Sequence, residues 1–410
     1  MKTIITTLAI SAAFILHAAP TVSGVTVTQD SRSHMVKVSY SLSEPAIVTV
    51  DFTTNGVSIG EANFRNVAGD VNSVVRKTDG MILWRPHAKD AWPDHVIRDG
   101  SFKAVVKAWS LGAPPEWLVA DLRMTNAVNF YVSEEALPYG IDDIRYRKEL
   151  LLMRKITAAG IKWLMGAPAG EKGQTDAGAE TQHFVMLTND YYIGVFEFTK
   201  GQQNVAFKSS ESAVTNPASG MSYNTIRGTQ FTWPQDMHQV APSSKMGVLR
   251  AITGLEMDLP TEAEWEYACR AGTTTSLNSG KNLLNSASSD ANLDEVGWYY
   301  THNAMHAVGL KRPNSWRLFD MHGNVREYCL DWFSAGDDYL ATFGENYQSG
   351  DVVVAPVGAE SGDKRADRGS SYNLWGAGAR SGARLAYSPD STGNNFGFRV
   401  VCPADIVIAE

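Results

Sequence analysis

Cysteine is scarce in this sequence, which has only Cys269, Cys329 and Cys402 among its 410 residues. In an oxidising compartment an odd number leaves at least one thiol unpaired, so at most one disulfide can form. This excludes a fold that depends on a framework of disulfide bridges. Because 44% of the residues are hydrophobic, an apolar core of ordinary size is expected instead.

Basic clusters and long apolar runs are also missing. The formal net charge is −8, and no group of Lys or Arg is dense enough to neutralise phosphates, so nucleic acid is not an expected partner. Beyond the N-terminus no stretch approaches 18 apolar residues, so no stable membrane span is predicted.

The N-terminus has the pattern of a secretory signal peptide over residues 1–19. Lys2 precedes an apolar run from Leu8 to Leu16, and the small residues Ala18 and Ala19 follow it. The pattern predicts an exported protein, secreted or periplasmic. A retained N-terminal anchor is the alternative.

The length predicts two domains. Apolar and polar residues alternate along residues 24–110, as at Val36, Val38 and Tyr40, which predicts a small all-β sandwich of the immunoglobulin or fibronectin kind. No chemical constellation lies within it, so a spacer or docking role is expected. The break "LGAPPEW" then begins a linker over residues 111–159, with a strand and a short helix near "RYRKELLLMRK".

From Trp163 onwards Gly, Asn, Asp, Trp and Tyr become frequent, and regular elements are hard to place. Long irregular stretches in a compact domain indicate a fold built on loops. One helix stands out in "LPTEAEWEYACRAG": Thr261 is the N-cap, Glu264 completes a capping box, and Gly272 is the C-cap.

Four blocks of sequence carry a family resemblance over about residues 160–402. They are "LMGAPAGEKGQTDAGAETQHFVMLTNDYYIGVFEFTKGQ" (164–202), "DLPTEAEWEYACRAGT" (258–273), "LFDMHGNVREYCLDWF" (318–333) and the segment from "RGSSYN" to "GFRVV" (368–401). In this order they resemble the sulfatase-modifying factor family, the formylglycine-generating enzymes and their relatives. The resemblance implies a mixed α+β fold, C-type-lectin-like, low in regular structure and commonly stabilised by calcium. Bacterial origin is an impression from the same resemblance.

Catalytic members of that family hold copper(I) with two cysteines of the last block and oxidise a substrate cysteine to formylglycine. Soft thiolates suit Cu(I). Carried over by resemblance, the two cysteine positions fall at Leu374 and Ala379, which cannot ligate a metal. A copper site built from another cysteine is the weaker alternative, so copper is not expected and enzyme activity stays open.

Calcium is the metal that the resemblance favours. In "DMHGNVRE", Asp320 and Glu327 supply carboxylates, while Gly323 allows a turn that directs its own carbonyl and that of Val325 to one point, as calcium prefers. A capped turn with a salt bridge to Arg326 or a neighbour is the alternative. By resemblance a second site would use the residues Asn292 and Leu293.

The last block would also line a binding groove. By resemblance its floor and wall consist of Ser371, Asn373, Trp375, Arg384 and Asn395. An exposed Trp beside Asn and Arg suits a peptide or carbohydrate ligand. A buried Trp375, with Arg384 paired to an acid such as Asp390, is the alternative.

Two functions follow from these expectations. The first is an exported binding or scaffold module, a pseudoenzyme stabilised by calcium. The second is an active non-haem metal oxidoreductase of the same family on an unknown substrate. His302 and His306 are spaced as two ligands on one helical face would be, but their surroundings indicate a loop, so they give the second hypothesis little support.

Overall fold

A computed structural model describes residues 19–88, 91–93, 95–97, 100–174, 178–285, 289–335, 342 and 350–406. The predicted signal peptide, apart from its last residue, lies outside the described residues. Within the described part of the chain, every helix is too short or too polar to cross a lipid bilayer.

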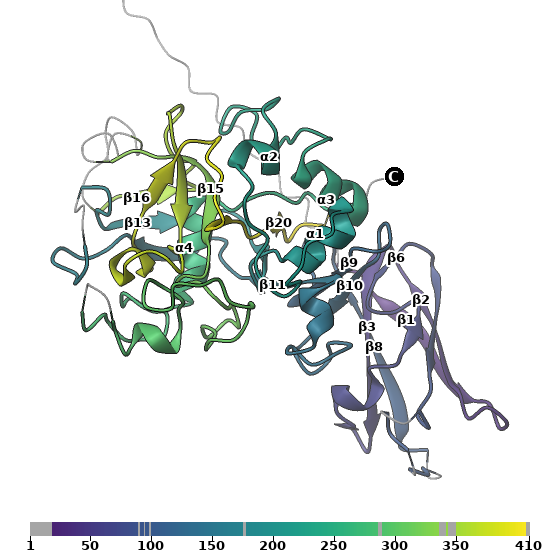
Figure 1. The fold of residues 1–410 in the computed structure, drawn as a ribbon. Helices are drawn as coiled ribbons and strands as arrows, with labels where there is room; N and C mark the ends of the chain where they lie inside the picture. The colour runs from purple at the N-terminus through teal and green to yellow at the C-terminus, as the bar shows by residue number, and fades with distance from the viewer. Residues whose placement is uncertain are drawn as a thin grey trace, which may run out of the picture.

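The N-terminal unit consists of two antiparallel sheets around one core (Figure 1). One sheet has the order β1-β2-β7-β5; the other has the order β4-β3-β6, and β8 also pairs with β3. The strands are β1 (Val22–Gln29), β2 (Val36–Leu42), β3 (Ala46–Thr54), β4 (Val57–Ser58), β5 (Ala68–Gly69), β6 (Val74–Val75), β7 (Asp79–Trp84) and β8 (Phe102–Trp109). Alternate residues of β2 point into the core, where Phe52 and Trp84 stack with ring centroids 4.5 Å apart.

The segment expected to be a linker, residues 111–159, contributes three strands to a sheet. It carries β9 (Trp117–Asp121), β10 (Val128–Tyr131) and β11 (Leu150–Ile156), and these join β14 (Tyr191–Gly194) and β20 (Val401–Pro403) in a sheet of order β10-β9-β11-β14-β20. The helix expected near "RYRKELLLMRK" is only the 3₁₀ turn η2 (Ile144–Arg147), followed directly by β11. The apolar run from Leu150 to Met153 is buried on both faces of the sheet, which favours a strand.

Two further sheets and four short helices make up the rest of the described chain. The first sheet joins β12 (Lys162–Met165), β13 (His183–Met186) and β16 (Val352–Val354), and the second joins β18 (Leu385–Tyr387), β17 (Arg365–Arg368), β15 (Arg326–Trp332) and β19 (Phe396–Gly397). The helices are α1 (Lys200–Phe207), α2 (Tyr223–Arg227), α3 (Lys245–Thr253) and α4 (Glu262–Arg270). The fold is therefore mixed and rich in sheet, with little helix and long irregular connections.

Helix α4 confirms the helix expected from the sequence. Thr261 Oγ1 accepts from the Glu264 amide at 3.2 Å, and the Glu264 carboxylate accepts from the Thr261 amide at 2.9 Å. The C-cap is Ala271 in the left-handed region, one residue before the expected Gly272. The helix packs on β12, β15 and β17, so it positions the last block of the sequence (Figure 1).

Candidate functional site

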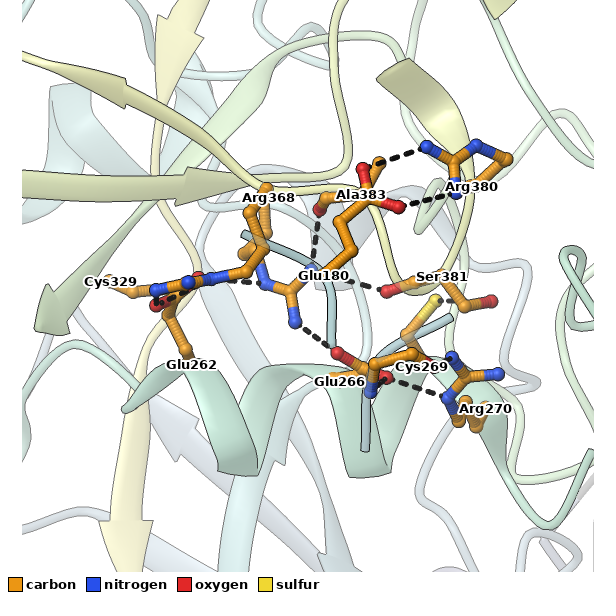
Figure 2. A network of polar contacts seen from close by, with 12 residues as sticks. Glu180, Glu262, Glu266, Cys269, Arg270, Cys329, Arg368, Arg380, Ser381 and Ala383 are labelled. Carbon is orange, nitrogen blue, oxygen red and sulfur yellow. Dashed lines mark hydrogen bonds and ion pairs between the residues drawn. The ribbon is translucent and has the colours of Figure 1, made fainter. Parts of the chain in front are cut away.

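Buried arginines anchor the loop of residues 368–384 to helix α4. Arg368 donates to Glu266 and, at 2.5 Å, to the Ala383 carbonyl, while Arg270 donates to the other oxygen of Glu266 at 2.8 Å (Figure 2). Burial alone would raise the pKa of Glu266, but Arg270 and Arg368 hold it below its ordinary value. The carboxylate is therefore charged, and removing one partner from such a buried network costs about 3–5 kcal/mol.

A second pair anchors the middle of the same loop. Arg380 donates to both carboxylate oxygens of Glu180, each at 2.8 Å (Figure 2). It also donates to Glu171 at 2.8 Å. The loop is thus fixed at Arg368, Arg380 and Arg384, and the residues between them are presented on a rigid support.

Arg384, expected in the groove wall, is instead part of this support. It is 8% exposed; its Nε donates to Glu262 at 2.9 Å, and its Nη1 donates to the carbonyls of Ala179 and Ser334. Arg384 is thus paired with an acid, which was the alternative to a place in the groove. The acid is Glu262, however, and not Asp390. Asp390 accepts from Asn224 at 2.6 Å.

Of the other four groove residues, three are joined by hydrogen bonds. Ser371 donates to Asn373 Oδ1 at 2.9 Å, and Asn395 Nδ2 donates to the same oxygen at 3.2 Å. Ser371 is buried and Asn373 is exposed, so the trio runs from the interior to solvent. Trp375 is half-exposed and stacks on Tyr300, a residue that the sequence analysis did not single out.

Leu374 and Ala379 stand where the resemblance places the family's copper cysteines, and their side chains offer no metal donor. Ala379 is buried, and its carbonyl accepts from His322 Nδ1 at 2.6 Å; the Leu374 carbonyl accepts from the Tyr300 amide. All three cysteines lie in different elements as free thiols, and burial raises the pKa of each, to about 12 for Cys269 and Cys402. Since the thiolate is the metal ligand, the described residues do not fit copper.

The expected calcium ligands lie in a buried acidic cluster. Asp320 is 2% exposed; its Oδ2 accepts from the Gly309 amide at 2.6 Å, while its Oδ1 has no hydrogen-bond partner among the described residues. Burial, with Glu327 adding to it, raises the pKa of Asp320 to about 6. Burial together with Asp320 and Glu327 also raises the pKa of Glu197 well above its ordinary value. Burial and the neighbouring acids therefore disfavour the charged forms of Asp320 and Glu197.

Glu327 is the expected ligand whose oxygens are already engaged. Arg399 donates to both of them, with Nη2 at 2.8 Å from Oε1, and Trp265 Nε1 donates to Oε2 at 2.7 Å. Within the described residues no group of three or more His, Cys, Asp or Glu side chains has the arrangement of a metal site. Of the two carboxylates, Asp320 alone has an oxygen without a partner, so the fit to calcium rests on it.

Gly323 lies in a turn that leaves no room for a side chain. Gly323 has φ 129°, and a Cβ there would lie 1.9 Å from the Trp298 carbonyl oxygen, so no larger residue fits. The Val325 amide donates to Glu197 at 3.0 Å, and Asn324 donates to the other oxygen of Glu197 at 2.8 Å. Sequence reasoning missed Glu197, although a single acid within the apolar run "VFEF" was the available signal.

The second expected calcium pair is committed to a turn. Asn292 Nδ2 donates to the Asn282 carbonyl at 2.8 Å, and the Leu293 carbonyl accepts from the amides of Val296 and Gly297. Both amides of the pair donate to Asp290 Oδ1, at 2.9 and 3.0 Å. The Asn292 side chain and the Leu293 carbonyl are therefore already engaged in hydrogen bonds of this turn.

His302 and His306 lie in a loop, as the sequence indicates. Their ring centroids are 6.2 Å apart, and His306 stacks on Trp298 at 3.7 Å. Burial, with Lys311 contributing, lowers the pKa of both imidazoles, so both are neutral at pH 7. They act as ring contacts in this structure.

Comparison with known proteins identifies the family to which the chain belongs. Residues 156–404 match the family model for the sulfatase-modifying factor enzyme 1-like domain, which is well over half of the chain. The chain therefore belongs to this family, as the four sequence blocks indicated. The match begins within β11, so the five-stranded sheet crosses its boundary.

Individual relatives are similar over part of their length. The formylglycine-generating enzyme of Streptomyces coelicolor is 34% identical over 162 residues, which cover 36% of this chain and 47% of that enzyme. That of Bos taurus is 31% identical over 157 residues, covering 36% of this chain and 38% of the enzyme. The chain thus spans about half the length, or less, of these curated relatives. Among solved structures, PvdO from Pseudomonas aeruginosa is similar with a TM-score of 0.46 and 21% identity, over 62% of this chain and 94% of that one.

Proposed function

We propose that this chain is an exported member of its family that lacks copper-dependent cysteine oxidation and serves as a binding or scaffold module. The observation that carries the proposal is the pair Leu374 and Ala379 at the positions where the resemblance places the copper cysteines. Aliphatic side chains cannot hold Cu(I), which needs soft sulfur ligands. The three buried thiols, whose pKa burial raises, are poor replacements.

We also propose the finer architecture. Family membership and the long irregular connections support a C-type-lectin-like arrangement for residues 160–402. The two facing sheets of the N-terminal unit support an immunoglobulin-like or fibronectin-like sandwich that acts as a spacer or docking module. A secreted or periplasmic location rests on the signal pattern of residues 1–19 alone.

The proposal is tested by copper loading. The mature chain is incubated with Cu(I) under reducing conditions and desalted, and its copper content is measured by mass spectrometry. Oxygen uptake with a cysteine-containing peptide is measured in parallel. We expect no retained copper and no uptake. A double variant, Leu374→Cys with Ala379→Cys, is the matched control, and we expect it to retain more copper than the wild type. Stoichiometric copper or iron in the wild type, with oxygen uptake, would overturn the proposal.

Calcium is the proposed stabilising ion. Support comes from Asp320, whose buried Oδ1 has no partner among the described residues, and from the acids Glu197 and Glu327 beside it. Asp320 and the carbonyls of Gly323 and Val325 would hold the ion, which supplies charge compensation and no redox chemistry. Asn292 and Leu293 remain the proposed second site, on the family resemblance only.

Chelation should therefore lower the melting temperature of the wild type. An ion that binds only the folded state stabilises it by mass action, by about 2.7 kcal/mol at a hundredfold excess over its Kd. We expect Asp320→Ala to lose the response to EDTA and added calcium that comes from this first site, so its melting temperature should shift less than that of the wild type. An equal response of the variant and the wild type would contradict the assignment of Asp320.

A further inference from the structure

One pair of aromatic side chains is exposed beside the groove residues. All eleven Trp residues lie in the described part of the chain, and Trp375, 50% exposed, is the only one with an exposed side chain. Tyr300 is 44% exposed and stacks on it, with ring centroids 4.3 Å apart and an interplanar angle of 22°. Exposed aromatic rings of this kind offer a flat apolar face to a ligand.

The pair is held in place before any ligand arrives. The Tyr300 amide donates to the Leu374 carbonyl at 2.9 Å, which ties together the two loops that carry the rings. Gly376 follows Trp375, and a Cβ there would lie 3.0 Å from the Leu293 side chain, so the backbone is packed closely on the interior. A preformed surface loses little conformational entropy on binding.

Amide side chains lie on the loop that carries Trp375 and on the segment that is hydrogen-bonded to that loop. Asn373 is exposed two residues before Trp375, and Asn395 is half-buried and bonded to it at 3.2 Å. An amide side chain both donates and accepts hydrogen bonds, as a sugar hydroxyl does. Flat rings flanked by such groups suit a ligand with one apolar face and a rim of hydroxyls.

Charged residues are absent from the segments that carry the rings and the amide groups. Residues 297–309, 369–379 and 391–398 contain no Asp, Glu, Lys or Arg, although the exposed Asp390, which accepts from Asn224, directly precedes the third segment. Asp294 and Lys311 flank the first segment, but the Asp294 carboxylate accepts from Tyr299 at 2.7 Å, and Lys311 donates to the Asp294 carbonyl at 2.6 Å. A phosphate, a carboxylate or a charged peptide would have no countercharge within these segments, whereas a neutral polar ligand needs none.

We infer that this surface binds a neutral saccharide, with one sugar ring stacked on Trp375 and its hydroxyls bonded to Asn373 and Asn395. The inference rests on the proposed function, since it takes the groove as a binding site and not as an oxidase centre. It names the ligand class of that site: an uncharged pyranose chain rather than a peptide.

The test uses the full mature chain and immobilised neutral oligosaccharides, namely cellohexaose, xylohexaose, mannohexaose and chitohexaose. A cysteine-containing peptide and heparin form the competing arms. We expect the wild type to bind at least one neutral oligosaccharide and Trp375→Ala to bind it at least about tenfold more weakly. Trp375→Phe, which keeps a flat ring, should lose less. Leu310→Ala is the matched control, because Leu310 is 63% exposed nearby and lies outside the three segments.

Each outcome decides the inference. Absence of binding to every neutral oligosaccharide, equal binding by Trp375→Ala, or binding of the peptide or heparin alone overturns it. Thermal melts check that Trp375→Ala is folded, and Asn373→Ala gives a second, polar probe of the same surface. If saccharide binding fails and no copper is retained, only this inference falls. If copper is retained with oxygen uptake, the proposed function falls whatever the saccharide result.

Discussion

Asp367 lies fully buried in β17, opposite Tyr328 of β15. Its nearest cation is Arg326, with Nη1 3.7 Å from Oδ1, and neither carboxylate oxygen has a hydrogen-bond partner among the described residues. Burial raises the pKa of Asp367 to about 7, although Arg326 acts against the shift. A charged carboxylate in this position is costly, so the folded state holds its proton to higher pH than the unfolded chain does.

Asp367 should therefore make the protein less stable as pH rises. Below about pH 4, near the pKa of Asp in the unfolded chain, Asp367 is protonated in both states. Between about pH 4 and pH 7 only the unfolded chain releases this proton. This favours unfolding by at most about 1.4 kcal/mol per pH unit. We expect Asp367→Asn to lose less stability between pH 5 and pH 8 than the wild type, measured by urea denaturation. Asp390→Asn, an exposed control, should follow the wild type. Parallel pH profiles of Asp367→Asn and the wild type would refute the shift.

Two single residues show where sequence reasoning succeeded and where it failed. Trp375 was named as a surface candidate, and it is half-exposed. Arg384 was named for the same groove, but it is held by Glu262 of α4, which is 122 positions earlier in the chain. A residue type predicts what a side chain can do; its partner is set by which distant segments meet.

Helix α4 is the element that the sequence defined best. Local signals suffice for it, because the capping box of Thr261 and Glu264 closes within three residues. The helix also buries Glu262 and Glu266 almost completely. Arg270 of the same helix pairs with Glu266, but Arg384 and Arg368 reach Glu262 and Glu266 from the far end of the sequence, and that was not readable from α4 alone.

Removing the cap should weaken the helix measurably. Thr261→Ala leaves the Glu264 amide without its side-chain acceptor, and we expect a loss of about 1 kcal/mol in the free energy of unfolding. Thr261→Ser keeps the hydroxyl and should stay near the wild type in the same denaturation experiment. An equal loss in both variants would indicate that the Thr methyl group, rather than the cap, contributes the stability.

At the scale of the whole molecule, the two units share a core. Ile47 belongs to β3 of the N-terminal unit, yet it is fully buried in the cluster that contains Leu118 and Phe130. The Phe130 amide donates to the Asn72 carbonyl at 2.7 Å, which joins β10 to the N-terminal unit. The segment of residues 111–159 is thus a structural junction, although its Pro-containing start is typical of a linker.

Ile47→Ala should destabilise the whole molecule. We expect a loss of about 2–5 kcal/mol from the removed methyl groups and the cavity they leave. Because the cluster connects both units, calorimetry should show one transition moved to lower temperature. Val57→Ala, at a side chain that is 69% exposed, should change stability by less than about 0.5 kcal/mol. Two separate transitions, only one of them shifted, would show that the units unfold independently.

The sequence by itself determined the family, the α4 helix and the strand alternation of the N-terminal unit. These are local patterns or residue identities, and they do not depend on which segments meet. The tertiary structure alone decided that residues 111–159 enter a sheet and that Glu327 is engaged by Arg399. It alone placed Tyr300 under Trp375. Each of these joins residues far apart in the chain, and the free energy of such contacts comes from burial and charge pairing that no single segment encodes.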